Sequence, residues 1–155
     1  MTELTAAARN IELQISVRVE DACSRFVLDN IGYKIIDLII SRTLCGKDID
    51  GRSFTPYSED YKEQKKKEGY YTGCVNLWRK GTMLSAMKFQ KTGECSGNVV
   101  LTGHHYSNQS SSAMARAHQF GNHYLPARPF FGWKDGSMED DELRRMAGCI
   151  IRQII

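Results

Sequence analysis

The chain has 155 residues, of which 41% are hydrophobic and 25% charged, the proportions of a single globular domain. Its formal net charge of +3 is too small to predict nucleic-acid binding from the total alone. The five cysteines form no Cys-x-x-Cys pair and no apolar run is long enough to span a bilayer, so we expect no disulfide framework, zinc site or membrane segment.

The N-terminal part of the chain predicts a strand followed by a long helix. Apolar and polar side chains alternate over residues 10–18, which is the period of a strand with one buried face. Over residues 19–39 the apolar side chains recur instead at three- and four-residue spacing, which places them on one face of a helix. We therefore expect a strand over 10–18 and a long helix over 19–39.

The periodicity disappears over residues 42–80, a polar segment interrupted by glycine and proline and rich in tyrosine. One short helix is predicted inside it, over residues 59–67, with Ser58 as its N-terminal cap. Loops of this length in a compact domain are commonly functional or ordered by a partner. We expect residues 42–80 to form a long loop or arm that is ordered by assembly.

The rest of the chain predicts a hairpin, an extended segment and two further helices. Residues 87–91 and 98–102 have the character of two strands joined around Thr92 and Gly93, and residues 107–118 that of a short helix ending near Gly121. Pro126 and Pro129 exclude a central strand over residues 126–132 and predict an edge or an extended arm. A final helix is expected from Ser137 onward.

These elements together predict an α+β fold in a single domain, residues 1–155. A small antiparallel sheet is expected to pack with the long N-terminal helix and the C-terminal helix, with a long central loop. No internal repeat or low-complexity segment divides the chain.

No motif predicts catalysis or a bound metal. The four histidines, His104, His105, His118 and His123, have no spacing of a known ligand set. Residues 48–51 resemble the start of a calcium loop but lack its later glycine and glutamate, so a plain turn is favoured. There is also no Gly-x-Ser-x-Gly nucleophile turn and no phosphate-binding loop. We expect no catalytic residue, no metal and no cofactor.

Three segments in chain order carry a resemblance to a known group of proteins. They are residues 42–65 with Phe54-Thr-Pro56-Tyr57, then Gly81-Thr-Met-Leu84-Ser-Ala-Met87, then His118-Gln-Phe-Gly121 followed by Pro126-Ala-Arg-Pro129-Phe-Phe-Gly132. Together they resemble the phage virion morphogenesis and tail-completion families, whose members build the head-tail neck. The resemblance covers roughly residues 35–155, and its most specific part is the last segment.

The resemblance implies a structural, non-enzymatic subunit of the neck of a tailed bacteriophage. Such a subunit forms a homo-oligomeric ring, usually hexameric, between the head-side connector or stopper proteins and the tail terminator or tail tube proteins. Double-stranded DNA passes transiently through the lumen, which we expect to lack strong cationic clustering because sliding requires weak contacts. The protein is expected in the virion, after assembly in the host cytoplasm and without contact with a membrane.

Aromatic side chains and stiff proline segments are the candidate contacts with neighbouring subunits, because interfaces favour aromatic anchors. An oligomeric ring also needs two different surface patches on each subunit. The candidates are Phe54, Pro56, Tyr57, Tyr61, Tyr70, Tyr71, Leu84, His118, Phe120, Arg128, Phe130 and Phe131. Gly121, Pro126 and Pro129 are expected to determine the shape of the backbone.

Some candidates have a second interpretation. Phe54 is equally expected to pin the loop onto the chain's own core. Arg128 is expected to bond a carboxylate, either within the chain or on a neighbouring subunit. If the arm is extended, Phe130 and Phe131 should point in opposite directions, one inward and one toward a neighbour or solvent.

Two other classes of function are weighed against the ring subunit. A nucleic-acid-binding accessory protein would use residues 62–67, although acidic residues among these lysines favour an ordinary solvated helix face. A metal-dependent hydrolase would use the four histidines and would contain bound metal. For the ring subunit, Tyr57→Ala or Tyr61→Ala should impair assembly more than folding.

Overall fold

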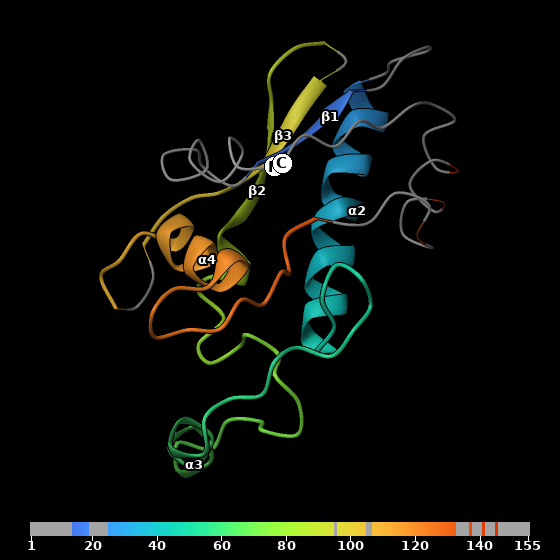
Figure 1. Ribbon diagram of the computed structural model, residues 1–155. Helices are drawn as coiled ribbons and strands as arrows, with labels where there is room; N and C mark the ends of the chain where they lie inside the picture. The colour runs from blue at the N-terminus through green and yellow to red at the C-terminus, as the bar shows by residue number, and fades with distance from the viewer. Residues whose placement is uncertain are drawn as a thin grey trace.

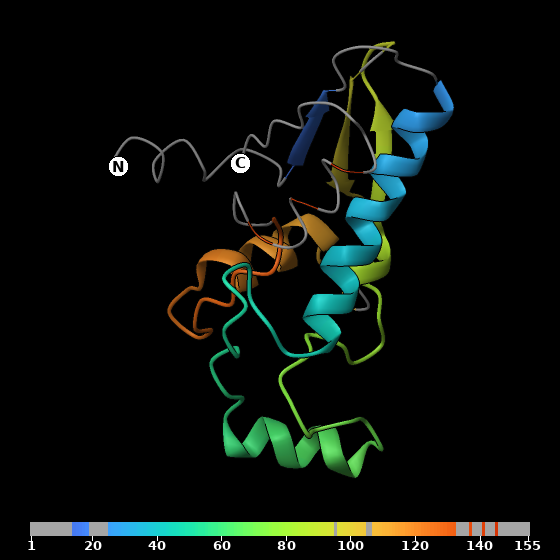
Figure 2. The same ribbon diagram turned by 90° about the vertical axis from the view of Figure 1, so that its right-hand side faces the viewer.

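The computed structural model describes residues 14–18, 25–94, 96–104 and 107–132, together with residues 137, 141 and 145. In chain order the elements are β1 (Gln14–Arg18), α2 (Arg25–Leu44), α3 (Glu59–Lys67), the short 3-10 helix η1 (Leu84–Ala86), β2 (Met87–Lys91), β3 (Ser96–Leu101) and α4 (Ser111–Phe120). In both ribbon views α2 runs beside the sheet, and α3 lies at the end of the molecule farthest from it (Figure 1 and Figure 2). The fold is α+β with a small antiparallel sheet, as predicted.

The sheet has the order β1-β3-β2, and both pairings are antiparallel. The predicted hairpin is present, with Phe89 of β2 opposite Val99 of β3 and the turn closed by Thr92 N, which donates to Ser96 O at 3.0 Å. The first predicted strand is also confirmed over its described residues, with Ile15 opposite Val99 on the other side. Residues 10–13 of that prediction lie outside the described ranges.

Helix α2 approaches the sheet closely because a glycine faces it. A Cβ built on Gly32 would lie 2.2 Å from Cγ of Phe89, and one built on Gly97 of β3 would lie 2.3 Å from Cζ of the same ring. Phe89 therefore fills the space that two absent side chains leave, one on the helix and one on the neighbouring strand. The glycine that propensity alone disfavours in a helix is here required by packing.

The end of α2 differs from the prediction, which placed it at residue 39. The helix continues to Leu44 and then ends in a Schellman motif, in which Gly46 N donates to Thr43 O and Lys47 N donates to Arg42 O. Gly46 has a φ of +76°, the left-handed conformation that this motif requires. The start of the predicted helix, residues 19–24, lies outside the described residues.

The segment after α2 packs on the chain's own core. Phe54, Val75 and Leu77 are buried in the same apolar cluster as the inner face of α2. Helix α3 has the predicted bounds, and its cap is the predicted Ser58, whose side chain accepts a hydrogen bond from Tyr61 N at 3.4 Å. The contacts within one chain therefore hold the ends of the long loop.

Helix α4 ends where Gly121 turns the chain back. Gly121 has a φ of +72°, and a Cβ there would lie 2.7 Å from Ala127 N, so only glycine fits this position without strain. After the turn, Arg128 N donates to His118 O at 2.6 Å. The shape-determining role predicted for Gly121 agrees with this geometry. The C-terminal helix predicted from Ser137 lies almost entirely outside the described residues.

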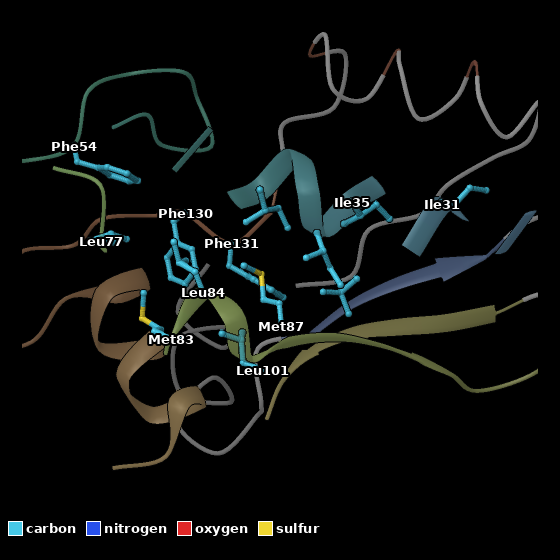
Figure 3. Packing of buried hydrophobic residues seen from close by; sticks show 14 of the residues in the cluster. Ile31, Ile35, Phe54, Leu77, Met83, Leu84, Met87, Leu101, Phe130 and Phe131 are labelled. Carbon is cyan, nitrogen blue, oxygen red and sulfur yellow. The ribbon is translucent and has the colours of Figure 1, made fainter. Parts of the chain in front are cut away.

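The core joins elements from the whole described chain. Figure 3 shows Phe130 and Phe131 from the segment after α4 directed into the cluster that holds Leu84, Met87 and Ile35. Among the described helices, none is both long enough and apolar enough to cross a membrane.

Candidate partner-binding groove

Tyr57 is the centre of a cluster of polar side chains between α3 and the proline-rich segment. Its ring contacts that of Tyr61 edge to face, with centroids 5.0 Å apart, and its hydroxyl oxygen accepts a hydrogen bond from Leu77 N at 3.2 Å. Burial, followed by the neighbouring Tyr61 hydroxyl, raises the pKa of Tyr57, so this phenol is neutral at ordinary pH.

Lys65 approaches the Tyr57 ring from α3. Its side chain is only 1% exposed, its Nζ lies 4.9 Å from the ring centroid, and it donates to Asn76 Oδ1 at 2.8 Å. The same Asn76 oxygen accepts from Trp78 N at 3.1 Å. Burial lowers the pKa of Lys65. The prediction that residues 62–67 form a solvated face is wrong for Lys65, which lies one helical turn after Tyr61 on the inner face of α3.

Arg128 approaches the Tyr57 ring from the other segment, with its guanidinium carbon 5.1 Å from the centroid. It is 3% exposed, and Nε and Nη2 donate to the carbonyl oxygens of Thr55 and Pro56, each at 2.9 Å. Burial lowers the pKa of Arg128, but a guanidinium remains charged in proteins. Among the described residues Arg128 has no carboxylate partner, and two main-chain carbonyls take the place in which we expected an internal carboxylate.

The arm, defined as residues 126–132, is held through its main chain. Gln119 Oε1 accepts hydrogen bonds from both Phe130 N and Phe131 N at 3.0 Å, and its Nε2 donates to Phe131 O at 3.2 Å. Arg42 Nη2 donates to Phe130 O at 2.7 Å and to Gly132 O at 2.5 Å. Residues 126–132 therefore belong to no strand of the sheet and are held by side chains from α2 and α4.

The prediction that one of Phe130 and Phe131 points toward a neighbour or solvent is wrong. Both are 0% exposed and their ring centroids lie 6.2 Å apart. Alternation of side chains applies to a strand, whereas here one glutamine oxygen binds two successive amide groups, which strand pairing does not allow.

A groove of about 620 Å³ opens beside Tyr57. Its aromatic lining is Tyr57, Tyr61 and Tyr124, its basic lining is Arg79, Lys80, His118 and Arg128, and its apolar lining is Leu77, Met83, Met114, Leu125 and Pro126. None of the described residues that line it is Asp or Glu. Arg79 donates to both oxygens of Glu68, with Nε at 2.9 Å from Oε2, and this bond is the main reason why the pKa of Glu68 is lowered.

Some of the predicted interface residues line the groove, and the others lie elsewhere in the fold. Pro56, Tyr57, Tyr61, His118 and Arg128 line it, together with Pro126. A second group is buried in the core and offers no surface: Phe54, Leu84, Phe130 and Phe131. A third group, Tyr70, Tyr71 and Phe120, does not line the groove, although Phe120 is 50% exposed and Tyr71 is also largely exposed.

Several residues of the groove were not predicted from the sequence. Met114 lies on α4 one turn before the predicted His118, a spacing that the sequence contains, and Tyr124 and Leu125 lie in the turn after that helix. Tyr124 is 88% exposed. Lys65 and Gln119 had no local signal, since each is identified only by partners elsewhere in the chain.

The other predicted motifs are turns or isolated side chains. Asp48 Oδ1 accepts hydrogen bonds from Asp50 N at 2.9 Å and Arg52 N at 2.8 Å, which is the geometry of a plain turn. Within the described residues, no group of three or more His, Cys, Asp or Glu side chains is placed to hold a metal ion. His105 lies outside those residues.

Comparison of the chain with protein-family profiles, curated proteins and solved structures found no match. The proposed function therefore rests on the sequence segments and on the geometry of the groove and the arm.

Proposed function

We propose that this protein is a structural subunit of the head-tail neck of a tailed bacteriophage, which forms a homo-oligomeric, hexameric ring between the head connector and the tail. Its neighbours in the particle are the head-side connector or stopper and the tail terminator or tail tube. Double-stranded DNA passes through the ring. The support comes from three sequence segments and from the way in which they meet in the fold.

The observation that carries the proposal is that the three resembling segments meet in the fold, the first and last through hydrogen bonds and the middle one through the apolar core. Arg128 of the last segment bonds Thr55 O and Pro56 O of the first, and Arg42 of the first bonds Phe130 O of the last. Leu84 of the middle segment lies in the same core cluster as Phe130. Motifs that are distant in the sequence thus determine one local structure, as expected when a resemblance reflects a shared fold.

Two exposed aromatic side chains on different parts of the surface are the contacts that we propose for the ring. A heterologous interface needs different surfaces on the two sides of each subunit. Tyr33 on α2 is one exposed aromatic side chain, and Tyr124 after α4 is another, placed at the groove. Exposed aromatic rings of this kind are favoured as interface anchors.

The nucleic-acid-binding alternative is less well supported by the geometry. Lys65, in the middle of the basic segment, is buried and bonded to Asn76, and Lys62 forms an ion pair with Glu59 at 3.8 Å. A phosphate-binding face needs several cations that are free to reach the backbone of the nucleic acid. Helix α3 presents instead a mixture of both signs.

Two measurements test the proposal. The mass of the purified protein under native conditions should be a multiple of 17.6 kDa, with six copies as the expected ring. A phage that carries a stop codon in this gene should produce filled heads and separate tails, and a plasmid copy of the gene should restore joined particles. A synonymous change at the same codon is the control. Infectious particles that form normally without the protein would contradict the proposal.

A further inference from the structure

Two buried cations, Lys65 and Arg128, contact the Tyr57 ring, and neither has a carboxylate partner among the described residues. Neither Lys65 nor Arg128 forms an ion pair with any residue in the described part of the chain. Their partners are neutral: the Asn76 amide for one, two main-chain carbonyls for the other, and the face of the Tyr57 ring for both. Burying charge without an opposite charge is costly, so this end of the groove retains a surplus of positive potential.

Arg128 lines the groove, so its positive charge attracts an anionic group that enters there. Nε and Nη2 are occupied by the carbonyls of Thr55 and Pro56, whereas Nη1 makes no hydrogen bond within the described residues. The guanidinium is held rigidly by these bonds and by the ring beneath it. A carboxylate that enters the groove therefore meets a donor that has little conformational entropy left to lose.

The remaining lining determines what must accompany the carboxylate. Met83, Met114 and Leu125 form an apolar wall, and methionine side chains adapt readily to different apolar partners. A volume of about 620 Å³ is that of a small-molecule site and accommodates a short extended peptide segment. A DNA duplex has no apolar side chain to place against this wall, and the cations at the base of the groove are too deeply buried to follow its phosphates.

We propose that the groove binds an extended acidic segment of a neighbouring protein, with a carboxylate at Arg128 and an adjacent apolar side chain against Met83, Met114 and Leu125. This rests on the proposed function only in taking the partner to be a neighbouring protein of the particle. The acidic and apolar character of the partner is inferred from the residues that line the groove. In this mode of peptide recognition, an extended segment places a charged side chain and an apolar side chain in separate pockets.

The test is a selection of short random peptides displayed on yeast, with the purified full-length protein as bait. The selected peptides should carry Asp or Glu next to a large apolar residue. A synthetic copy of the best peptide should bind about ten-fold more tightly than the same peptide with its carboxylates replaced by amides. Binding should also shift the Nε–H resonance of Arg128.

Surface variants locate the binding without disturbing the fold. Lys80→Glu reverses an exposed charge that lines the groove, and Tyr124→Ala removes an exposed ring there. Each variant should lower the affinity for the peptide by about five-fold or more. Lys88→Glu makes the same charge change on β2, away from the groove, and should leave the affinity unchanged.

Three results would overturn the inference. The first is a selection that yields no acidic peptides, or yields peptides that bind equally well to Lys80→Glu. The second is a short DNA duplex that displaces the peptide and binds more tightly, which would make the groove a nucleic-acid site. In the third, unlabelled protein displaces the peptide and Lys80→Glu breaks the oligomer, which would identify a second copy as the occupant. If the protein binds the acidic peptide but stays monomeric, the proposed peptide site is supported and the proposed ring is contradicted.

Discussion

The molecule has two regions that are held together in different ways. The sheet region, β1 to β3 with α2, is stabilised by apolar packing, as where Phe89 fits between Gly32 and Gly97. The groove region, α3, the end of α4 and the arm, is organised by a few long polar side chains that bond main-chain groups. Apolar packing tolerates variation if volume is kept, whereas each polar bond requires one particular partner. Mutations should therefore have different signatures in the two regions.

The largest effect is expected where the two regions meet. Phe130→Ala or Phe131→Ala should lower the free energy of unfolding by about 3–5 kcal/mol, because each ring is fully buried in the shared core. Urea denaturation measures the change. Phe120→Ala is the control, since that ring is half exposed. A small loss for either buried ring, similar to that of the control, would contradict its placement in the core.

Gln119→Ala tests whether polar side chains hold the groove region through main-chain hydrogen bonds. The change leaves the amides of Phe130 and Phe131 without their acceptor and should cost about 2–3 kcal/mol. The amide protons of these two residues should exchange faster in the same variant. Gln90→Ala on β2 removes an exposed glutamine and should be nearly neutral. Unaltered exchange of both amides would show that Gln119 does not hold the arm.

Gly32→Ala tests whether close apolar packing stabilises the sheet region. Alanine favours a helix over glycine, but its Cβ would overlap the Phe89 ring, so we expect a net loss of about 1–3 kcal/mol. A smaller side chain at position 89, as in the double variant with Phe89→Leu, should recover part of the lost stability. Ser41→Ala, on an exposed position of α2, is the control for helix propensity. A gain in stability for Gly32→Ala alone would refute the close approach.

A smaller, pH-dependent effect is expected at Lys65. Its pKa is lowered below 10.5 by burial, so the folded state releases this proton at lower pH than the unfolded state. The unfolded state then binds more protons, and this group makes stability rise as the pH approaches 10.5 from below. Lys65→Met should abolish that rise, whereas Lys66→Met, at an exposed position, should retain it. Parallel stability curves for all three proteins would contradict the burial of Lys65.

Tyr61→Ala should have the smallest effect on stability and the clearest effect on assembly. The ring is partly buried at the groove and contributes an edge contact with Tyr57, worth about 1 kcal/mol. Native mass and thermal melting of the same sample separate the two effects. Tyr57→Ala is the comparison, and it should cost more stability because its hydroxyl bonds Leu77 N. Intact assembly of Tyr61→Ala with a large loss of thermal stability would make this residue structural.

The features that the sequence predicted correctly depend on neighbouring residues. Helix α3 has the predicted bounds because Ser58 and the first turn provide a local start signal, and the β2–β3 hairpin follows from alternation about Thr92 and Gly93. The end of α2 was predicted too early, since the signal that ends the helix is Gly46, beyond the last clear apolar repeat.

The features that were missed depend on distant residues. Lys65 has its partner Asn76 on the other side of a loop, and Arg128 bonds carbonyls more than seventy positions earlier in the chain. No periodicity records such pairs. The burial of both phenylalanines of the arm has the same origin, because Gln119 and Arg42, which bond the main chain of this segment, lie elsewhere in the sequence.

The main-chain bonds of the arm have a consequence for proteolysis. A protease must draw an extended stretch of substrate into its own active site, and segments without helix or strand are its usual targets. Here the amides of Arg128, Phe130 and Phe131 and the carbonyls of Phe130 and Gly132 are all already bonded within the protein. The arm is thus irregular in shape yet resistant to cleavage until the surrounding core opens, so digestion at this point reports global unfolding rather than local motion.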